Sequence, residues 1–329
     1  MRALACPDKL KGVLTAAEAA QALGEGLVRA GVEAELLPLA DGGEGTAEAL
    51  HAALGGEWRS ARVADPLGRP VDAAFLLLPD GRAVVESAQA IGLWRLAPGE
   101  LDPLRASSRG LGELLLAAAR EARQGIVVAL GGSATVDGGA GLREVVTELP
   151  LPVTVACDVS NPLLGPRGAA RVFGPQKGAT PEQVEELELR LAAMPELAPV
   201  ARLPGAGAAG GLGAALAALG GTLVAGIGLV LEAVRFDEHL EGVALVVTGE
   251  GAVDLSSAEG KTSAGVAAVC ARAGVPCVVF GGLVETGAAA ALHEAGATAV
   301  FSLSGKPERA RADLVELGEA LGRLARRLS

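Results

Sequence analysis

Both ends of the sequence alternate short apolar runs with helical segments, and this alternation constrains the fold more than any other feature. Near the N-terminus, residues 3–6 and 33–39 are predicted strands. Between them a helix begins with the capping box of Thr15 and Glu18 and ends at Gly31. A second helix is predicted over 45–54. Strands that alternate with helices form parallel sheets with right-handed crossovers.

The last third of the chain repeats this alternation. Strands are predicted over 243–248, 275–280 and 299–303, and helices over 263–273, which Gly274 ends, and 285–295, which Gly296 ends. A final helix repeats leucine at 314, 317, 321, 324 and 328. We therefore predict one doubly wound, flavodoxin- or Rossmann-like α/β domain built jointly from residues 1–55 and 236–329.

The middle of the chain has a different character. Short strands over 58–64, 71–78 and 82–86 are joined by tight turns, which is typical of an antiparallel meander. A helix over 111–123 and strands over 126–130 and 153–157 follow. Thr180, Pro181 and Gln183 begin another capped helix, with Val184, Leu187, Leu191 and Met194 on one face. Residues 56–235 are thus expected to form an inserted mixed α/β domain, with the active site in the cleft between the two domains.

Composition excludes several classes of protein. The net charge of -11, with aromatic residues at only 2%, argues against nucleic acid and anionic membranes as partners. The uncharged stretch 205–231 is rich in glycine, so a buried loop and helix is favoured over a membrane span. The four cysteines lack metal or redox spacing and are interpreted as free thiols in a reducing cytoplasm.

Ligands of open parallel sheets bind beyond the carboxyl ends of the strands, and this rule selects candidate residues without any motif. Asp8, Asp41 and Glu250 follow predicted strands near the two ends of the chain, and Asp158 follows one in the middle. The loop 131–141 reads GGSATVDGGAG. Its glycines let backbone N–H groups approach a phosphate, and Ser133 and Thr135 add hydroxyl donors. Four basic residues could neutralise phosphate or carboxylate: Lys11, Arg69, Lys177 and Lys261.

Two motifs are rejected as nucleotide sites. Residues 260–262 end like a P-loop, but position 255 is leucine where that motif needs glycine. Gly205, Gly207 and Gly210 have dinucleotide-binding spacing, but Pro204 precedes them and no clear strand leads into them.

Several segments together resemble the bacterial two-domain glycerate kinases. The similar pieces run in order over nearly the whole chain: PDKLKG at 7–12, ADGGEGT at 40–46, DPLGRPV at 65–71, GGSATVDGGAG at 131–141, the segment 157–179, PGAGAAGGLGAAL at 204–216, and TGEGAVD with GKTSAGVA within 248–267. The resemblance implies transfer of phosphate from ATP, with Mg²⁺, to D-glycerate. The resemblance favours 2-phosphoglycerate as the product. The protein is expected in the cytoplasm, and a homodimer is one possible assembly.

The sequence departs from the family pattern at a few positions. Lys9 and Leu10 stand where serine and phenylalanine are usual, Val136 where asparagine is usual, and Ala252 where arginine is usual. Ser256 replaces a usual glutamine, and a segment is missing between Gly141 and Val153. A degenerate member that binds a metabolite or nucleotide without catalysis is therefore kept as an alternative, ahead of a nicotinamide-dependent hydroxy-acid oxidoreductase.

Phosphoryl transfer needs positioning, charge neutralisation and a carboxylate beside the attacking hydroxyl, and these needs assign hypothetical roles. The catalytic candidates, in order of preference, are Asp41, Asp158 and Asp8, together with Lys11. The ATP-binding candidates are Gly131, Gly132, Ser133, Thr135, Gly138, Gly139, Glu250 and Lys261. The substrate-binding candidates are Arg69, Lys177, Asn161 and Glu44. Asp137 and Glu250 are the candidate magnesium ligands.

Overall fold

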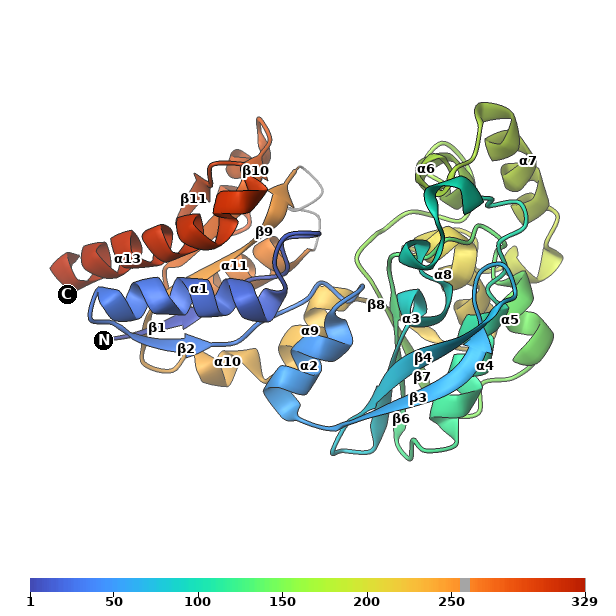
Figure 1. Ribbon diagram of the computed structural model, residues 1–329, viewed down its shortest axis with the longest axis horizontal. Coiled ribbons are helices and arrows are strands. Elements are labelled where there is room, and N and C mark those ends of the chain that lie inside the picture. Colours follow the sequence, from blue (N-terminus) through green and yellow to red (C-terminus); the bar gives the residue numbers. More distant parts are fainter. Residues whose placement is uncertain (255–260, 329) are drawn as a thin grey trace. The chain divides into compact units, whose positions relative to one another are not determined.

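The computed structural model describes residues 1–254 and 261–328, and the chain divides into two units (Figure 1). Unit 1 comprises Met1–Asp41, Glu48–Ala53 and Ile227–Ser329. Unit 2 comprises Gly42–Ala47 and Leu54–Gly226. Each unit contains its own sheet, so the predicted two-domain α/β architecture is confirmed.

Unit 1 contains a five-stranded, wholly parallel sheet in the order β11-β10-β9-β1-β2. Its strands are β1 (Arg2–Ala5), β2 (Glu33–Leu36), β9 (Val243–Val253), β10 (Cys277–Val284) and β11 (Ala299–Ser302). Its helices are α1 (Ala16–Arg29), α2 (Thr46–Leu54), α9 (Gly226–Ala233), α10 (Phe236–His239), α11 (Thr262–Ala273), α12 (Ala288–Glu294) and α13 (Ala310–Leu328). The first residues of α2 and α9 belong to unit 2.

The helices of unit 1 cover both faces of its sheet, as a doubly wound fold requires. Leu23 and Leu27 of α1 and Leu314 of α13 pack with Val247 and Phe280 on one face. Alternate strand residues point to the other face, where α11 contributes buried apolar residues such as Val266, Ala267 and Cys270. The four cysteines are free and buried, in agreement with their interpretation as small apolar residues.

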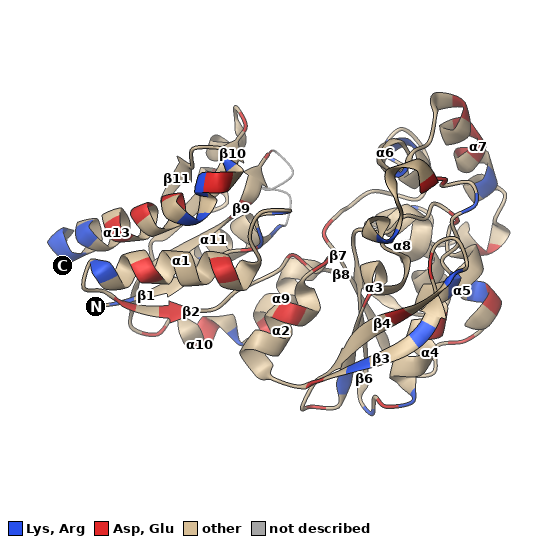
Figure 2. Cartoon of the chain, viewed as in Figure 1, with Lys and Arg blue, Asp and Glu red and all other residues tan. Residues whose placement is uncertain are grey.

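Local signals in the sequence set the ends of several elements. The Thr15–Glu18 capping box begins α1, and the Thr180–Gln183 box begins α7 (Pro181–Ala192). Gly274 ends α11 with a left-handed φ of 69°. The last turn of α13 is basic, which Figure 2 shows as blue at its C-terminal end. This positive charge interacts favourably with the negative end of the helix dipole.

Unit 2 contains a six-stranded mixed sheet in the order β3-β4-β5-β6-β7-β8. The predicted meander is confirmed, because β3 (Glu57–Ala64), β4 (Pro70–Leu77) and β5 (Arg82–Glu86) pair antiparallel. The remaining strands pair parallel: β6 (Gly125–Leu130), β7 (Val153–Cys157) and β8 (Thr222–Ala225). The helices are α3 (Ser87–Ile91), α4 (Arg109–Ala119), α5 (Ala140–Val145), α6 (Ala169–Phe173), α7 and α8 (Ala208–Ala218).

A few predicted elements differ from the structure. The strand predicted over 275–280 begins after Pro276 and continues to Val284, so the helix predicted from 285 begins only at Ala288. The stretch 205–231 contains the expected buried loop and helix. It also contains β8, which the glycine-rich sequence did not predict. Leu324 of α13 is 53% exposed and does not continue the apolar face that Leu314 and Leu321 form.

Glycines let α1 and α13 approach until their backbones touch. A Cβ on Gly26 would overlap the Val315 carbonyl oxygen, and one on Gly318 would overlap the Leu23 carbonyl oxygen. The two helices lie side by side in Figure 1. Larger residues at these positions would separate the helices and expose the apolar core beneath them.

We expect Gly26→Ala to destabilise the protein by about 2–3 kcal/mol, because overpacking outweighs the better helix propensity of alanine. Urea unfolding of the two proteins measures the difference. Gly228→Ala is the matched control in the same unit: Gly228 lies in α9, and a Cβ added there would meet no atom within 4 Å, so the same substitution should stabilise by about 0.5–1 kcal/mol. Equal effects at both positions would contradict this account.

Candidate functional site

Two acidic side chains come together in unit 1: Asp8 follows β1, and Glu250, which is predicted from the sequence to follow a strand, lies within β9 because that strand continues to Val253. The backbone N–H of Asp8 donates to the Gly249 carbonyl at 2.8 Å, so the chain leaving β1 runs alongside β9. Asp8 Oδ2 accepts a hydrogen bond from Thr262 Oγ1 at 2.7 Å, and Glu250 Oε1 accepts one from Ser263 Oγ at 2.9 Å. Hydroxyl groups at the start of α11 therefore orient both carboxyl groups.

Burial, and after it the charge of Asp41, raises the pKa of Asp8 to about 6. Burial also raises the pKa of Glu250 to about 7, with smaller upward contributions from Asp8 and Asp41 and downward ones from Ser263 and Lys261. We call Asp8, Asp41 and Glu250 the carboxylate cluster. Carboxyl groups that titrate near neutrality are suited to proton transfer at physiological pH.

The other unit 1 candidates differ in their access to solvent. Asp41 follows β2 and is partly exposed, whereas Asp8 is only 6% exposed. Lys11 is exposed, and its backbone passes so close to Gly251 that a Cβ there would lie 3.2 Å from Lys11 N. Lys261 precedes α11 as its N-cap residue, with its ammonium 3.9 Å from Asp254.

In unit 2 the loop after β6, residues 131–139, is held on both sides by hydrogen bonds, and we call it the glycine loop. Ser87 Oγ donates to the Gly131 carbonyl at 2.9 Å and accepts from its N–H at 3.2 Å. Leu93 N–H donates to the Gly132 carbonyl, and Ala134 N–H donates to the Ile91 carbonyl, both at 2.8 Å. The segment around α3 therefore fixes the path of this loop.

Within the described residues, the backbone N–H groups of Gly132, Ser133, Thr135 and Val136 have no acceptor. Ser133 and Thr135 are at most 2% exposed, and the hydroxyl of Thr135 also lacks a partner among the described residues. Buried N–H groups without partners are rare in folded proteins. Gly132 is in a left-handed conformation at φ 63°, and its N–H and that of Ser133 are adjacent donors, which makes this part of the loop a candidate anion nest.

The sequence predicts Lys177 at the substrate, but the residue lies buried against the glycine loop. It ends the 3-10 turn Pro175–Lys177 and is 3% exposed. Its ammonium donates to Ser133 Oγ at 3.0 Å and to the Thr135 carbonyl at 2.7 Å. Burial lowers the pKa of Lys177 to about 7, and the charge of Asp137 opposes that change.

The sequence predicts Asp137 as a magnesium ligand, but its carboxylate is instead occupied by four donors. Oδ2 accepts from Ser108 N–H at 2.8 Å, from Ser108 Oγ at 2.7 Å and from Gly141 N–H at 3.1 Å. Oδ1 accepts from Gly139 N–H at 3.1 Å. This arrangement joins the glycine loop to the start of α5 and leaves little of the carboxylate for a cation. Across residues 1–254 and 261–328, no group of three or more His, Cys, Asp or Glu residues is arranged to hold a metal.

The segment 42–47 packs against the glycine loop within unit 2. A Cβ on Gly131 would lie 3.0 Å from Glu44 N, and one on Gly132 would lie 3.0 Å from Glu44 Oε2. Glu86, at the end of β5, accepts hydrogen bonds from Gly45 N–H at 3.0 Å and Ala47 N–H at 2.8 Å. The structure thus brings the predicted Glu44 beside the loop.

The remaining unit 2 candidates have other surroundings. Arg69 pairs with Asp65 at 2.5 Å and with Glu100 at 2.7 Å. Asn161 donates to the Arg167 carbonyl at 2.8 Å, and Asp158 is partly exposed at the end of β7. The left-handed Gly138 and Gly139 are needed for close packing, since side chains there would meet Met194 or Ala215.

Sequence reasoning missed several residues that hold these clusters in place: Glu86, Ser87, Ser108, Thr262 and Ser263. Glu86 and Ser87 could have been found from the sequence. Glu86 ends a strand and Ser87 begins the next helix, and ligands of such sheets bind beyond the carboxyl ends of the strands. The others could be found only from the structure. The rejected P-loop motif includes residues 255–260, which lie outside the described residues, and the Thr262 hydroxyl is bound to Asp8. Residues 201–207 form turns, so no strand leads into Gly205.

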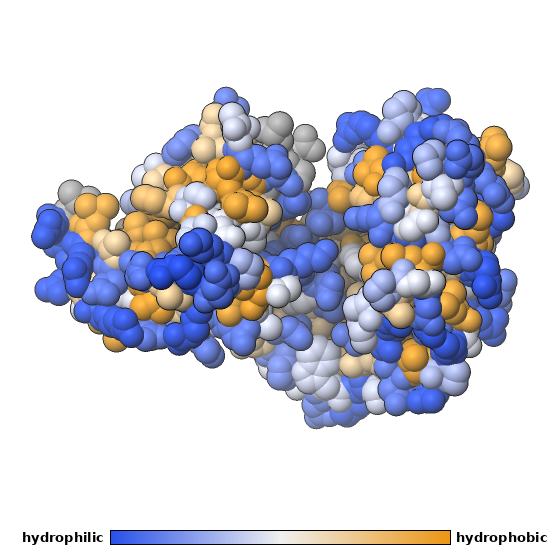
Figure 3. Space-filling view, turned by 45° about the horizontal axis from the view of Figure 1, so that its top comes forward, coloured by the Kyte–Doolittle hydropathy of each residue, from blue (hydrophilic) through white to orange (hydrophobic). Residues whose placement is uncertain are grey.

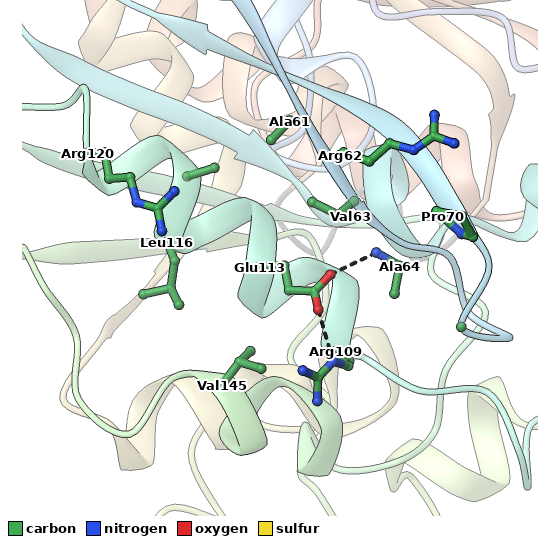
Figure 4. Close-up of a pocket in the computed structure, with 12 residues that line it drawn as sticks. Ala61, Arg62, Val63, Ala64, Pro70, Arg109, Glu113, Leu116, Arg120 and Val145 are labelled. Atoms are coloured by element: carbon green, nitrogen blue, oxygen red, sulfur yellow. Dashed lines mark hydrogen bonds and ion pairs between the residues drawn. The ribbon is translucent and has the colours of Figure 1, made fainter.

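A separate hollow of about 580 Å³ lies in unit 2 between β3 and α4 (Figure 4). Arg62, Arg109 and Arg120 line it, and Glu113 bonds to Ala64 N–H and Arg109 at its centre. None of the predicted site residues lines this hollow.

On the face shown in Figure 3, hydrophilic and hydrophobic residues are interspersed on both units. Among the helices that the structure describes, none combines the length and the apolar character needed to cross a bilayer.

Comparisons with known proteins agree with one another. A model of the glycerate kinase family matches residues 3–147 and 148–329. The glycerate 2-kinase of Escherichia coli K12 is 38% identical over 345 residues, covering 92% of this chain and 90% of the relative. The glycerate kinase of Halalkalibacterium halodurans is 40% identical over 323 residues, covering 85% of each. The crystal structure of a glycerate kinase 2 candidate from Salmonella typhimurium LT2 superimposes with a TM-score of 0.83 at 34% identity, covering 99% of this chain and 98% of that one.

The buried ammonium predicts a pH-dependent stability. The pKa of Lys177 falls from 10.5 to about 7 on folding, so the unfolded chain binds more protons between these values and stability rises with pH across them. We expect the Tm of Lys177→Met to exceed that of the wild type by most below about pH 7, with the difference shrinking as pH rises toward about 10. Thermal melts of both proteins across this range measure it. The exposed Lys306→Met is the control, and a difference that does not change with pH would refute the prediction.

Proposed function

The chain belongs to the glycerate kinase family, and on that premise we propose that it transfers the γ-phosphate of ATP to the 2-hydroxyl of D-glycerate, giving 2-phosphoglycerate and ADP. The observation that carries this proposal is the set of backbone N–H groups on the glycine loop, most of them on buried residues, that lack acceptors within the described part of the chain. A chain of phosphates supplies the anionic oxygens that such a nest requires. The 2-position is supported by the name of the Escherichia coli relative, a glycerate 2-kinase.

We assign the phosphate contacts to the glycine loop. The N–H groups of Gly132, Ser133 and Thr135 donate to phosphate oxygens, and the Ser133 hydroxyl adds another donor. Gly131 contributes differently, because its carbonyl accepts the hydrogen bond from Ser87 that fixes the loop. Gly138 and Gly139 act through loop shape, because their surroundings leave no room for side chains.

Asp41 is our first choice for the group that orients the attacking hydroxyl and accepts its proton. Asp41 is partly exposed, whereas Asp8 is nearly buried. We assign Asp8 a supporting role, because its carboxyl group interacts with the charge of Asp41. Asp158 remains the second choice, since it is also partly exposed at a strand end.

We propose that Mg²⁺ accompanies ATP and that Glu250 provides its carboxylate. Mg²⁺ usually keeps several waters and takes only one or two carboxylates together with substrate phosphates, so a cage of three acidic residues is not required. The raised pKa of Glu250 reflects burial and crowded negative charge, which a cation would relieve. When bound, the metal would neutralise charge on the phosphates.

The carboxylate of D-glycerate needs cations, and Lys11 and Lys261 are the best placed of the candidates in unit 1. Glu44, beside Gly132, is suited to accept a substrate hydroxyl. Arg69 and Asn161 remain weaker candidates because their side chains already bond within unit 2. Val136 packs with Leu163 and Leu187 in an apolar core, so its departure from asparagine removes no exposed contact. The free, buried cysteines are in keeping with a cytoplasmic enzyme.

A coupled ADP-release assay with Mg-ATP tests the activity. D-glycerate should give turnover of about 1–100 per second, lost in EDTA, while L-glycerate, glycerol and the sample without acceptor should not. NMR of the product then distinguishes the 2-phosphate from the 3-phosphate. Folded protein that binds ATP but releases no acceptor-dependent ADP would replace the kinase proposal with the binding-only alternative.

Asp41→Asn should lower kcat by about 10² or more, because an amide cannot accept the proton, while the fold remains intact. Steady-state kinetics with circular dichroism measures both properties. Asp80→Asn, at an exposed turn, is the control and should leave kcat unchanged. An unaffected kcat in Asp41→Asn would transfer the role to Asp158, which the same substitution there would reveal.

A further inference from the structure

Lys177 has a buried ammonium, and both of its hydrogen bonds are made to the glycine loop. The residue is 3% exposed, and its Nζ donates to Ser133 Oγ and to the Thr135 carbonyl of the glycine loop. Both partners lie between the N–H groups that have no acceptor among the described residues. Because the ammonium is bonded to the loop itself, its effect on a bound phosphate would pass through the position of the loop.

We infer that Lys177 is a positioning residue for nucleotide phosphate: its ammonium holds Ser133 and Thr135 so that the neighbouring N–H groups stay open to the phosphate oxygens. This inference rests on the proposed function and deepens it. Because Nζ donates to Ser133 Oγ, the hydroxyl proton of Ser133 is turned away from Lys177. That proton becomes a further donor for a phosphate on the open side.

The cost of burying this ammonium argues against a purely structural role. Among the described residues, no carboxylate lies within ion-pair distance of Lys177, and the nearby Asp137 is already occupied by its four donors. Well-packed apolar side chains are often at least as stable as buried charged groups. A positive charge in contact with the glycine loop and without an ion-pair partner instead strengthens the attraction of the loop for phosphate.

The glycine loop is also held by the turn at 209–211, which contacts the same carbonyl as the lysine. Ala209, Gly210 and Gly211 adopt left-handed conformations in succession, with φ values of 52°, 75° and 95°. A Cβ on Gly210 would overlap the Thr135 carbonyl oxygen, and the Gly210 carbonyl accepts from Gly138 N–H at 3.1 Å. The Thr135 carbonyl is therefore held between this turn and the Lys177 ammonium.

The test measures ATP binding by calorimetry separately from turnover. In Lys177→Met, loss of two charge-assisted hydrogen bonds should raise the Kd for ATP by about 10-fold or more. The KM for D-glycerate should not change, and the Tm should not fall. Lys306→Met, an exposed lysine outside both clusters, is the matched control and should bind ATP like the wild type.

Ser133→Ala provides a second variant that keeps the lysine and removes one of its acceptors. We expect it to weaken ATP binding, and the loss in the double variant should be smaller than the sum of the two single losses, because the Lys177–Ser133 hydrogen bond is shared between them. An unchanged Kd in Ser133→Ala would overturn the inference even if Lys177→Met failed to fold. So would a Lys177→Met protein with unchanged Kd, or one whose D-glycerate KM and Tm worsened together with its Kd.

The outcomes for the wild-type protein separate this inference from the proposed function. Wild-type protein that binds ATP, loses binding in Lys177→Met and phosphorylates no D-glycerate would support the inference and defeat the proposed function. Wild-type protein that binds neither ATP nor inorganic pyrophosphate would overturn both.

Discussion

Parallel pairing between β1 and β9 is the constraint on which unit 1 depends, because it joins segments from opposite ends of the chain. Thr248 Oγ1 donates to the Cys6 carbonyl across 242 residues of sequence, and Asp8 N–H continues the ladder to Gly249. Without this pairing, Asp8 and Glu250 would have no reason to meet. With it, both lie toward the carboxyl end of the sheet, where burial first, and the charge of Asp41 after it, raise the pKa of each toward neutrality. The chemistry of the carboxylate cluster is therefore a consequence of long-range strand order.

In unit 2 the candidate phosphate site is made mainly of backbone groups rather than side chains. The glycine loop can bind an anion mainly through its backbone. Several of its N–H groups have no acceptor among the described residues, and hydrogen bonds hold the loop in place. Lys177, Asp137 and Ser87 hold it by hydrogen bonds, and the left-handed turn at Gly210 supports it by close contact. A loop held so firmly is preorganised, and preorganised donors are what phosphoryl transfer needs from a protein.

Much of the fold could be predicted because its signals are local. Both capping boxes, the glycine ends of α1 and α11 and the antiparallel meander depend on residues adjacent in sequence. The strand-end rule also found Asp8, Asp41, Glu250 and the glycine loop. It could not assign their surroundings. The sequence predicts Lys177 as a cation that binds substrate, yet its ammonium is buried against the glycine loop, because burial depends on how the turn at 175–177 packs. Asp137 is an organiser of the loop for the same reason, since its four donors come from the loop, the start of α5 and Ser108.

The sequence by itself determined the α/β class, the helix and strand boundaries with strong caps, the family and the set of polar residues from which a site could be built. These properties follow from periodicity, capping and motif order, which act over a few residues or are read directly from the chain. Only the tertiary structure decided which of those residues meet one another, which are buried and which way their hydrogen bonds point. Burial and strand pairing are properties of contacts between distant segments, so the raised pKa of Glu250 and the buried ammonium of Lys177 exist only once the chain has folded.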